Sequence, residues 1–152
     1  MRVHVVYDSG FGNTELVAQR IGTVLGRTHE VTLKRVAEAH VADIAVGDVL
    51  IIGSPTQGGR ATPAVERYLA HLPDAVLEGL QFAAFDTRLT ARWVRMFGFA
   101  ADRMHRALTD RDAVALSMAQ GFAVAGKEGP LKVGELDRAA HWASDLLIPV
   151  MH

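Results

Sequence analysis

The feature that most constrains the fold of this chain is the alternation of short apolar runs with longer amphipathic segments. Residues 3–7 and 49–52 are almost wholly apolar and rich in Val and Ile, which is typical of strands buried on both faces. In 13–25 and 62–72 the apolar residues recur at helical spacing. Strands that alternate with helices form a parallel sheet with right-handed crossovers and helices on both faces.

The rest of the chain continues this pattern. Further strands are expected at 30–36, at 79–85 and, as one strand interrupted near Gln120 and Gly121, at 113–118 and 122–124. Further helices are expected across 88–108, with a break near Gly98, and across 135–148, where the inward residues would be Leu136, Ala140, Ala143 and Leu147. The length of 152 residues suits one core, so a single domain over 1–152 is expected.

The amino-acid composition restricts the functions that this chain can perform. Sixteen Lys and Arg against 17 Asp and Glu give a net charge of −1, which offers no case for nucleic-acid binding. The absence of Cys excludes disulfides, thiolate nucleophiles and iron–sulfur ligation, so redox chemistry would need a bound cofactor. No apolar run approaches the roughly 18 residues of a membrane span, and no signal peptide is recognisable. A soluble, cytoplasmic protein without a membrane span is expected.

The loop between the first strand and the first helix has the composition of a phosphate site. Its glycines allow close backbone approach, and its hydroxyl and amide side chains precede the free N–H groups of a helix N-terminus. A P-loop would need a Lys here, and the dinucleotide fingerprint would need Gly in place of Glu15. No Lys or Arg lies between Tyr7 and Leu16, so the anion would be held without a cation. The candidate residues are Ser9, Gly10, Phe11, Gly12, Asn13 and Thr14.

The stretch from Val5 to Ala18 resembles the phosphate-loop signature of flavodoxins, in which a hydroxyl residue is followed by Gly-Asn-Thr and the first helix. The resemblance implies a flavodoxin-like doubly wound sheet of five parallel strands, in the order 2-1-3-4-5, with helices on both faces. It also implies FMN as the cofactor, with the phosphate in this loop. Phe11 stands where the family usually has a hydroxyl residue, which would remove one hydrogen bond. The alternative is an ordinary Gly-rich turn.

Two later loops are candidates for the flavin ring. The segment 54–59 resembles the loop that borders the isoalloxazine in flavodoxin-like and NAD(P)H:quinone-reductase-like flavoproteins, although it lacks the aromatic residue that many flavodoxins stack on the ring. The segment 86–88 occupies the place of the family's second ring loop without matching its sequence. The residues expected around the ring are Ser54, Pro55, Thr56, Gln57, Gly58, Gly59, Asp86, Thr87 and Arg88.

Arginine is concentrated in the segment that begins at the second ring loop, residues 86–88. Residues 86–106 contain five Arg and two Asp, a local charge of +3. Arg88, Arg92 and Arg95 would share one face of a helix, with Leu89, Trp93, Met96 and Phe97 on another. Three interpretations stay open for the segment 88–97: a connecting helix that buries Trp93, a lid over the flavin, or a docking patch for an acidic partner.

The function favoured by these patterns is electron transfer by an FMN-binding protein, in which FMN carries the redox chemistry. The partner would be a redox protein or a small-molecule electron donor or acceptor. No catalytic residue or metal ligand can be named. The segments 122–131 and 134–136 resemble the C-terminal segment of many short flavodoxin-like proteins, which leads from the last strand into the last helix, and we assign them structure rather than chemistry. One alternative is an NAD(P)H- or quinone-linked flavin oxidoreductase, including a protoporphyrinogen-oxidase-like enzyme. Another is a flavin-free interaction module that uses the Arg-rich helix.

Overall fold

The computed structural model describes residues 2–90 and 98–147. Its strands are β1 (Arg2–Tyr7), β2 (Glu30–Arg35), β3 (Val49–Pro55), β4 (Gln81–Arg88), β5 (Val114–Ala115) and β6 (Gln120–Ala123). Its helices are α1 (Asn13–Leu25), α2 (Pro63–Ala70), α3 (Asp74–Leu77), α4 (Ala100–Thr109) and α5 (Glu135–Leu146), with two short 3-10 turns at Val36–Glu38 and Val41–Asp43. None of these described helices is long and apolar enough to cross a membrane.

The sheet is parallel, with the strand order β2-β1-β3-β4-β5, as expected from the sequence. The fifth strand is interrupted, as expected, but the interruption lies at 116–119 rather than near Gln120 and Gly121, which belong to β6. β5 pairs with the beginning of β4, and β6 pairs with its end, where Phe85 lies opposite Gln120. Tyr7 is level with Arg35 on β2 and with Gly53 on β3, so the loops that follow β1 and β3 leave the sheet side by side.

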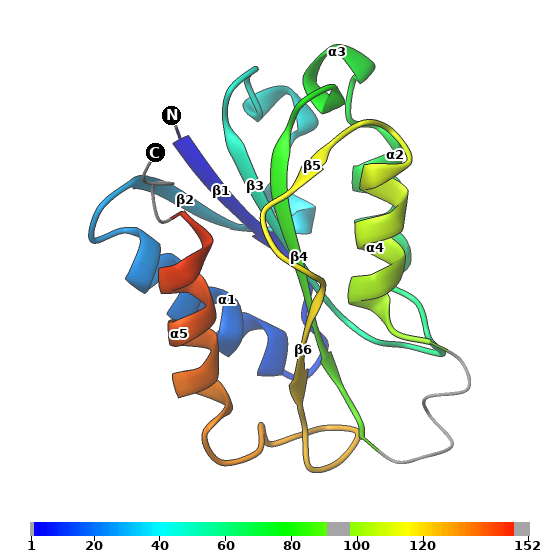
Figure 1. Cartoon of the computed structure of the whole chain (residues 1–152). Helices are drawn as coiled ribbons and strands as arrows, with labels where there is room; N and C mark the ends of the chain where they lie inside the picture. The colour runs from blue at the N-terminus through cyan, green and yellow to red at the C-terminus, as the bar shows by residue number, and fades with distance from the viewer. Residues whose placement is uncertain (1, 91–97, 148–152) are drawn as a thin grey trace.

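Helices cover both faces of the sheet. Figure 1 shows α1 and α5 on one side and α2 and α4 on the other. Successive strand residues face opposite sides, so Val5 belongs to the core under α1 and α5 whereas Val6 belongs to the core under α2 and α4. This two-sided burial explains why the central strands are continuous apolar runs in the sequence.

The prediction that a helix begins at Arg88 is wrong. Arg88 is the last residue of β4, and α4 begins at Ala100. β4 is longer than expected because its end pairs with both β3 and β6, and these neighbours extend the strand through Asp86 and Thr87. Residues 91–97 lie outside the described residues, and with them Arg92, Trp93, Arg95, Met96 and Phe97.

The inward face of α5 also differs from the expectation. Ala139, Ala143 and Leu146 are buried, whereas Leu136, Ala140 and Leu147 are half-buried. Of the four residues expected to face inward, only Ala143 does so fully. The small Ala side chains lie on the stripe that meets the core, and the larger Leu136 and Leu147 pack along its margin.

Candidate functional site

The loops after β1, β3 and β4 meet around one pocket of about 720 Å³, which we call the loop pocket. This is the carboxyl edge of the sheet, where doubly wound folds bind their ligands. The volume falls within the range of roughly 300–1,000 Å³ that is usual for cofactor sites. Of the residues predicted from sequence, the pocket is lined by Ser9, Gly10, Phe11, Asn13, Thr14, Pro55, Thr56, Gln57, Gly58, Gly59, Thr87 and Arg88.

Ser9 and Gly12 shape the first loop. The hydroxyl of Ser9 accepts hydrogen bonds from the N–H groups of Gly12 (3.1 Å) and Glu15 (3.4 Å). Gly12 caps α1 with φ of 90°, a left-handed conformation that favours glycine. Gly12 does not line the pocket, so its place in the site is to turn the chain into the helix.

The first loop leaves backbone donors free for an anion. Among the described residues, no acceptor is found for the N–H groups of Gly10, Phe11, Asn13 and Thr14. Two of these groups belong to the first turn of α1, where the helix itself supplies no acceptor and its dipole favours negative charge. The loop therefore has the donors that a phosphate group requires.

A hydroxyl pair lies between the first loop and β4. The side-chain oxygens of Thr14 and Thr87 are 2.8 Å apart, and both residues are buried while still lining the pocket. Only one of the two hydroxyls donates in this contact, so the other keeps its proton for a further acceptor. The pair supplies one side-chain donor next to the free backbone N–H groups.

The second loop is a tight turn. The backbones of Gln57 and Arg60 exchange two hydrogen bonds, of 2.8 and 3.0 Å, across Gly58 and Gly59. Gly58 and Gly59 have φ of 56° and 80°, which this turn requires at both central positions. The N–H of Thr56 donates to the carbonyl of Thr87 (2.9 Å) and so ties this loop to the third.

Ser54 and Asp86 lie beneath the pocket rather than in its lining. The Ser54 hydroxyl is fully buried, accepts from the N–H of Thr62 (3.0 Å) and donates to the carbonyl of Pro55 (2.9 Å). Asp86 is fully buried and paired with Arg88. Both predicted residues belong to strands that pair with each other, and in the structure they support the loops from within the sheet.

Comparison with known proteins decides the family. The family model described as flavodoxin matches residues 5–142, which is most of the chain. The chain belongs to the flavodoxin family. This membership confirms the resemblance seen in the phosphate loop, and the parallel sheet order agrees with it.

Individual flavodoxins resemble the chain to different extents. A flavodoxin from Megasphaera elsdenii is 32% identical over 97 residues, a match that spans 63% of this chain and 63% of that protein, less than two thirds of its length. The solution structure of two-electron reduced M. elsdenii flavodoxin has a TM-score of 0.71 at 26% identity, covering 93% of this chain and 98% of that one. Oxidised flavodoxin 1 from Bacillus cereus has a TM-score of 0.81 at 18% identity, covering 97% of each chain, and shows the fold alone.

In this flavodoxin-family chain the loop pocket includes three residues that sequence reasoning missed: Leu89, Val124 and Lys127. Val124 and Lys127 follow β6, in the segment that we treated as structural only. The position of the segment was the available signal, because the loops that follow the carboxyl ends of the strands lie at the edge of the sheet where this fold binds its ligands. Asn13 ties this loop to the first one by donating to the carbonyl of Glu128 (3.2 Å).

Arg35 on the neighbouring strand β2 contacts the first loop of this flavodoxin-family chain. Its guanidinium donates to the carbonyl of Ser9 (3.0 Å), forms an ion pair with Glu15 and lies over the Tyr7 ring at 5.4 Å. The loop itself contains no Arg. The register that aligns Arg35 with Tyr7 supplies one from the neighbouring strand.

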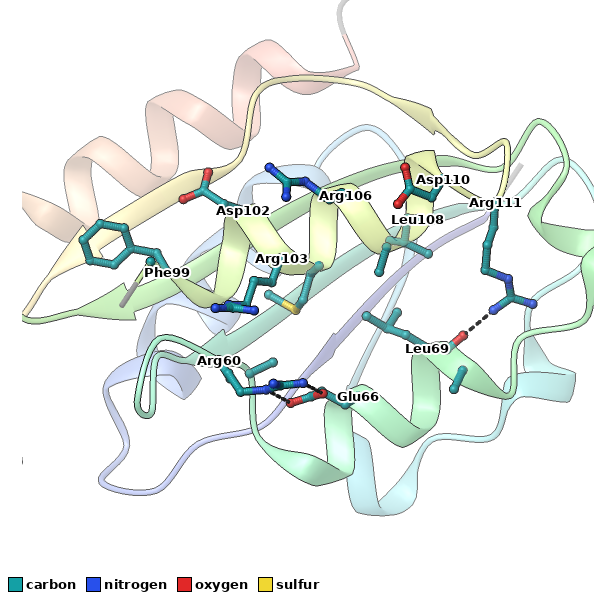
Figure 2. Close-up of a pocket in the computed structure, with 15 residues that line it drawn as sticks. Arg60, Glu66, Leu69, Phe99, Asp102, Arg103, Arg106, Leu108, Asp110 and Arg111 are labelled. Carbon is teal, nitrogen blue, oxygen red and sulfur yellow. Dashed lines mark hydrogen bonds and ion pairs between the residues drawn. The ribbon is translucent and has the colours of Figure 1, made fainter. Parts of the chain in front are cut away.

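A second hollow of about 720 Å³ lies between α2 and α4 (Figure 2). Leu69 and Leu108 are among its apolar lining residues, and Arg60 and Arg111 are turned to partners within the protein. Arg60 pairs with Glu66 at 3.1 Å, and Arg111 donates to the carbonyl of Leu69 at 3.0 Å. This groove is lined mainly by α2 and α4 and shares no described lining residue with the loop pocket.

Proposed function

We propose that this chain is an electron-transfer protein that binds FMN in the loop pocket. The proposal rests on its membership of the flavodoxin family and on one observation above all. A loop with four backbone N–H groups free of acceptors in the described structure opens into a pocket that is large enough for a flavin. FMN supplies the redox chemistry, and the chain binds and orients it and sets its electrostatic surroundings.

The phosphate would be held by the first loop. The N–H groups of Gly10, Phe11, Asn13 and Thr14 would donate to it, together with one hydroxyl of the pair formed by Thr14 and Thr87. Donors at a helix N-terminus hold an anion without a formal cation. Phe11 offers no hydroxyl, and its side chain is 56% exposed at the rim of the pocket.

The isoalloxazine would lie against the second and third loops. The turn at Gly58 and Gly59 lets the backbone approach a flat ring, and Pro55 restricts the segment before it. On the other side lie Thr87, Arg88 and Leu89 from the end of β4. These contacts exclude water from the ring and place it near the protein surface, where an electron donor or acceptor could approach.

The test is a visible absorption spectrum of the purified protein, followed by a titration of the apoprotein with FMN. We expect binding at micromolar concentration or tighter, with the flavin bands perturbed by the pocket. A colourless protein that fails to bind FMN at micromolar concentration would overturn the proposal. Steady-state turnover of quinone with NAD(P)H would identify the chain as an oxidoreductase rather than a carrier.

Three narrower statements are part of this proposal. The partner is a redox protein or a small-molecule electron donor or acceptor, residues 1–152 act as one domain, and the protein works in the cytoplasm. The first is testable by measuring electron exchange between the FMN-loaded protein and candidate reductases in stopped flow. Limited proteolysis followed by mass spectrometry tests the second, because one domain resists cleavage at internal sites.

A further inference from the structure

A buried ion pair lies at the ring side of the loop pocket. Asp86 is fully buried on β4, and the side chain of Arg88, two residues later, is 19% exposed and lines the pocket. The guanidinium Nε donates to one carboxylate oxygen of Asp86 at 2.7 Å, and Nη2 donates to the other at 2.8 Å. Such a two-point contact fixes both the position and the plane of the guanidinium.

Asp86 is itself held by the beginning of α4. Its carboxylate accepts from the N–H of Ala101 (2.8 Å) and from the hydroxyl of Thr56, which accepts in turn from the N–H of Ala100 (3.0 Å). Burial outweighs the other influences and raises the pKa of the Asp86 carboxyl above its ordinary value, although Arg88 and these donors each act in the opposite direction. The positive end of the helix dipole also favours the charged carboxylate. The anion is therefore anchored below the pocket.

The guanidinium of Arg88 is confined on its other sides. Its Cζ lies 3.7 Å from the centre of the Phe99 ring, a cation–π contact. A Cβ placed on Gly121 would come within 2.2 Å of the same carbon, so the side chain packs directly on the glycine backbone. Among the described residues, no acceptor is found for Nη1 of Arg88. Arg88 therefore keeps donor capacity for a ligand in the pocket.

The charge of the pocket lining is positive. Among the described residues that line it, Arg88 and Lys127 are charged and none is Asp or Glu. The carboxylates of the first loop are occupied elsewhere, because Asp8 accepts from the Thr62 hydroxyl (2.7 Å) and Glu15 pairs with Arg35. The charged side chains that face a ligand in this pocket are therefore cations rather than carboxylates.

We propose that Arg88, held in place by Asp86, stabilises reduced FMN relative to oxidised FMN in this pocket. The inference rests on the proposed function. Reduction adds negative charge to the ring, and a fixed cation at a half-buried position attracts that charge with little screening by solvent. Asp86 opposes this attraction only in part, because its carboxylate lies behind the guanidinium as seen from the pocket. Arg88 is thus a residue that sets the redox balance of the site.

The test compares the dissociation constants of oxidised and reduced FMN in anaerobic titrations of the apoprotein. In the double variant Asp86→Asn with Arg88→Gln, which removes both charges and keeps similar shapes, we expect the ratio of the reduced to the oxidised constant to rise about tenfold. For a two-electron couple, that change corresponds to a midpoint potential about 30 mV lower. Arg88→Lys keeps the cation and should keep the ratio within about threefold of the wild type.

Two further variants make the result decisive. Arg106→Gln removes a cation from α4 that lines the groove between α2 and α4 and not the loop pocket, and it should leave the ratio unchanged (Figure 2). If the double variant does not fold, as judged by circular dichroism, Arg88→Gln alone should raise the ratio in the same direction. A ratio equal to that of the wild type in every folded variant without the Arg88 cation would overturn the inference and leave FMN binding intact. Failure of the wild type to bind FMN would overturn the proposed function and the inference together.

Discussion

At the scale of single residues, Tyr68 on α2 combines burial with an unused polar atom. Its hydroxyl is buried and has no hydrogen-bond partner among the described residues, and burial raises its pKa to about 12, with a further contribution from Asp43. A buried hydroxyl without a partner costs free energy in the folded state. We therefore expect Tyr68→Phe to raise the free energy of unfolding by up to about 1 kcal/mol.

Urea denaturation of the apoprotein measures this change. Tyr7→Phe is the matched control, because the Tyr7 hydroxyl has a hydrogen bond to Glu15 and its loss brings no gain. A lower stability for Tyr68→Phe would show that the hydroxyl has a partner in solution, such as a bound water.

In the proposed FMN site, Thr14 belongs to the hydroxyl pair that would donate to the phosphate. We expect Thr14→Ala to weaken FMN binding by about 1–2 kcal/mol, as for the loss of one hydrogen bond to a charged group. Thr14→Ser keeps the hydroxyl and should bind FMN as the wild type does. Fluorescence titration gives both constants. Unchanged affinity in Thr14→Ala would place the phosphate elsewhere.

At the scale of elements, β2 contributes to the site although it supplies none of the described lining residues of the loop pocket. Arg35 donates to the carbonyl of Ser9, and this contact holds the loop that we propose binds the phosphate. We expect Arg35→Gln to weaken FMN binding by about threefold to tenfold, the loss of a partly exposed hydrogen bond of about 1 kcal/mol.

Lys34→Gln serves as the comparison, since Lys34 is the neighbouring cation on β2 and donates to Asp43, away from the loop. Isothermal titration calorimetry of both variants with FMN separates the two effects. Equal affinities for Arg35→Gln and Lys34→Gln would argue against any role of Arg35 in shaping the loop.

The contact between β3 and β4 depends on a glycine. A Cβ on Gly53 would come within 2.1 Å of the Phe85 ring, which is fully buried between the sheet and the helices α1 and α5. We expect Gly53→Ala to destabilise the protein by about 1–3 kcal/mol, because the ring has no space into which to move.

Gly22→Ala is the opposite case. Its Cβ would meet side chains of β2 only at 3.9 Å or more, and alanine favours the helix by about 0.5–1 kcal/mol over glycine. Thermal unfolding should show a lower midpoint for Gly53→Ala and a higher one for Gly22→Ala. A Gly53→Ala protein as stable as the wild type would mean that the ring is free to move.

At the scale of the whole molecule, Asp48 links two strands at the sheet edge opposite the loop pocket. Its carboxylate is buried and contacts the His4 ring (2.9 Å) and the N–H groups of Ala45 (3.0 Å) and Arg2 (3.3 Å). Burial alone raises the pKa of Asp48, but these hydrogen bonds outweigh burial, and the pKa lies below its ordinary value of 3.8.

The sign of the pH dependence follows from this lowering. A carboxylate whose pKa is lower in the folded state stabilises the fold fully above its unfolded pKa of 3.8, and this stabilisation is lost as the pH falls through the folded pKa. We expect Asp48→Asn to be less stable at neutral pH, by about 1–3 kcal/mol, and to lose less stability than the wild type on acidification below 3.8.

Urea denaturation at a series of pH values between about 2 and 7 checks this expectation. Asp137→Asn, at an exposed position of α5, should follow the wild-type curve. Parallel curves for Asp48→Asn and the wild type would show that Asp48 does not contribute to acid unfolding.

Local sequence patterns were sufficient to predict the order of the helices and strands and most of the residues that line the loop pocket. The apolar runs in β1 and β3 reflect burial on both faces, and the glycine-rich turn before α1 has the composition of an anion-binding loop. These features are properties of neighbouring residues, so a sequence displays them directly. The same locality explains why motifs pointed to residues 9–14 and 55–59, all of which line the loop pocket except Gly12.

The tertiary structure decided what depends on residues far apart in the chain. Strand register brings Arg35 to Ser9, β6 brings Lys127 to the pocket, and pairing with β3 and β6 extends β4 through Arg88 instead of a helix. The structure also shows that Asp86 is buried below the pocket, whereas Arg88 lines it. The sequence by itself determined the fold, because the fold follows from local pattern, and its resemblance to the flavodoxins implied FMN as the cofactor. The charge around the cofactor was decided by tertiary structure, because electrostatic interactions depend on distance and burial in space rather than on separation along the chain.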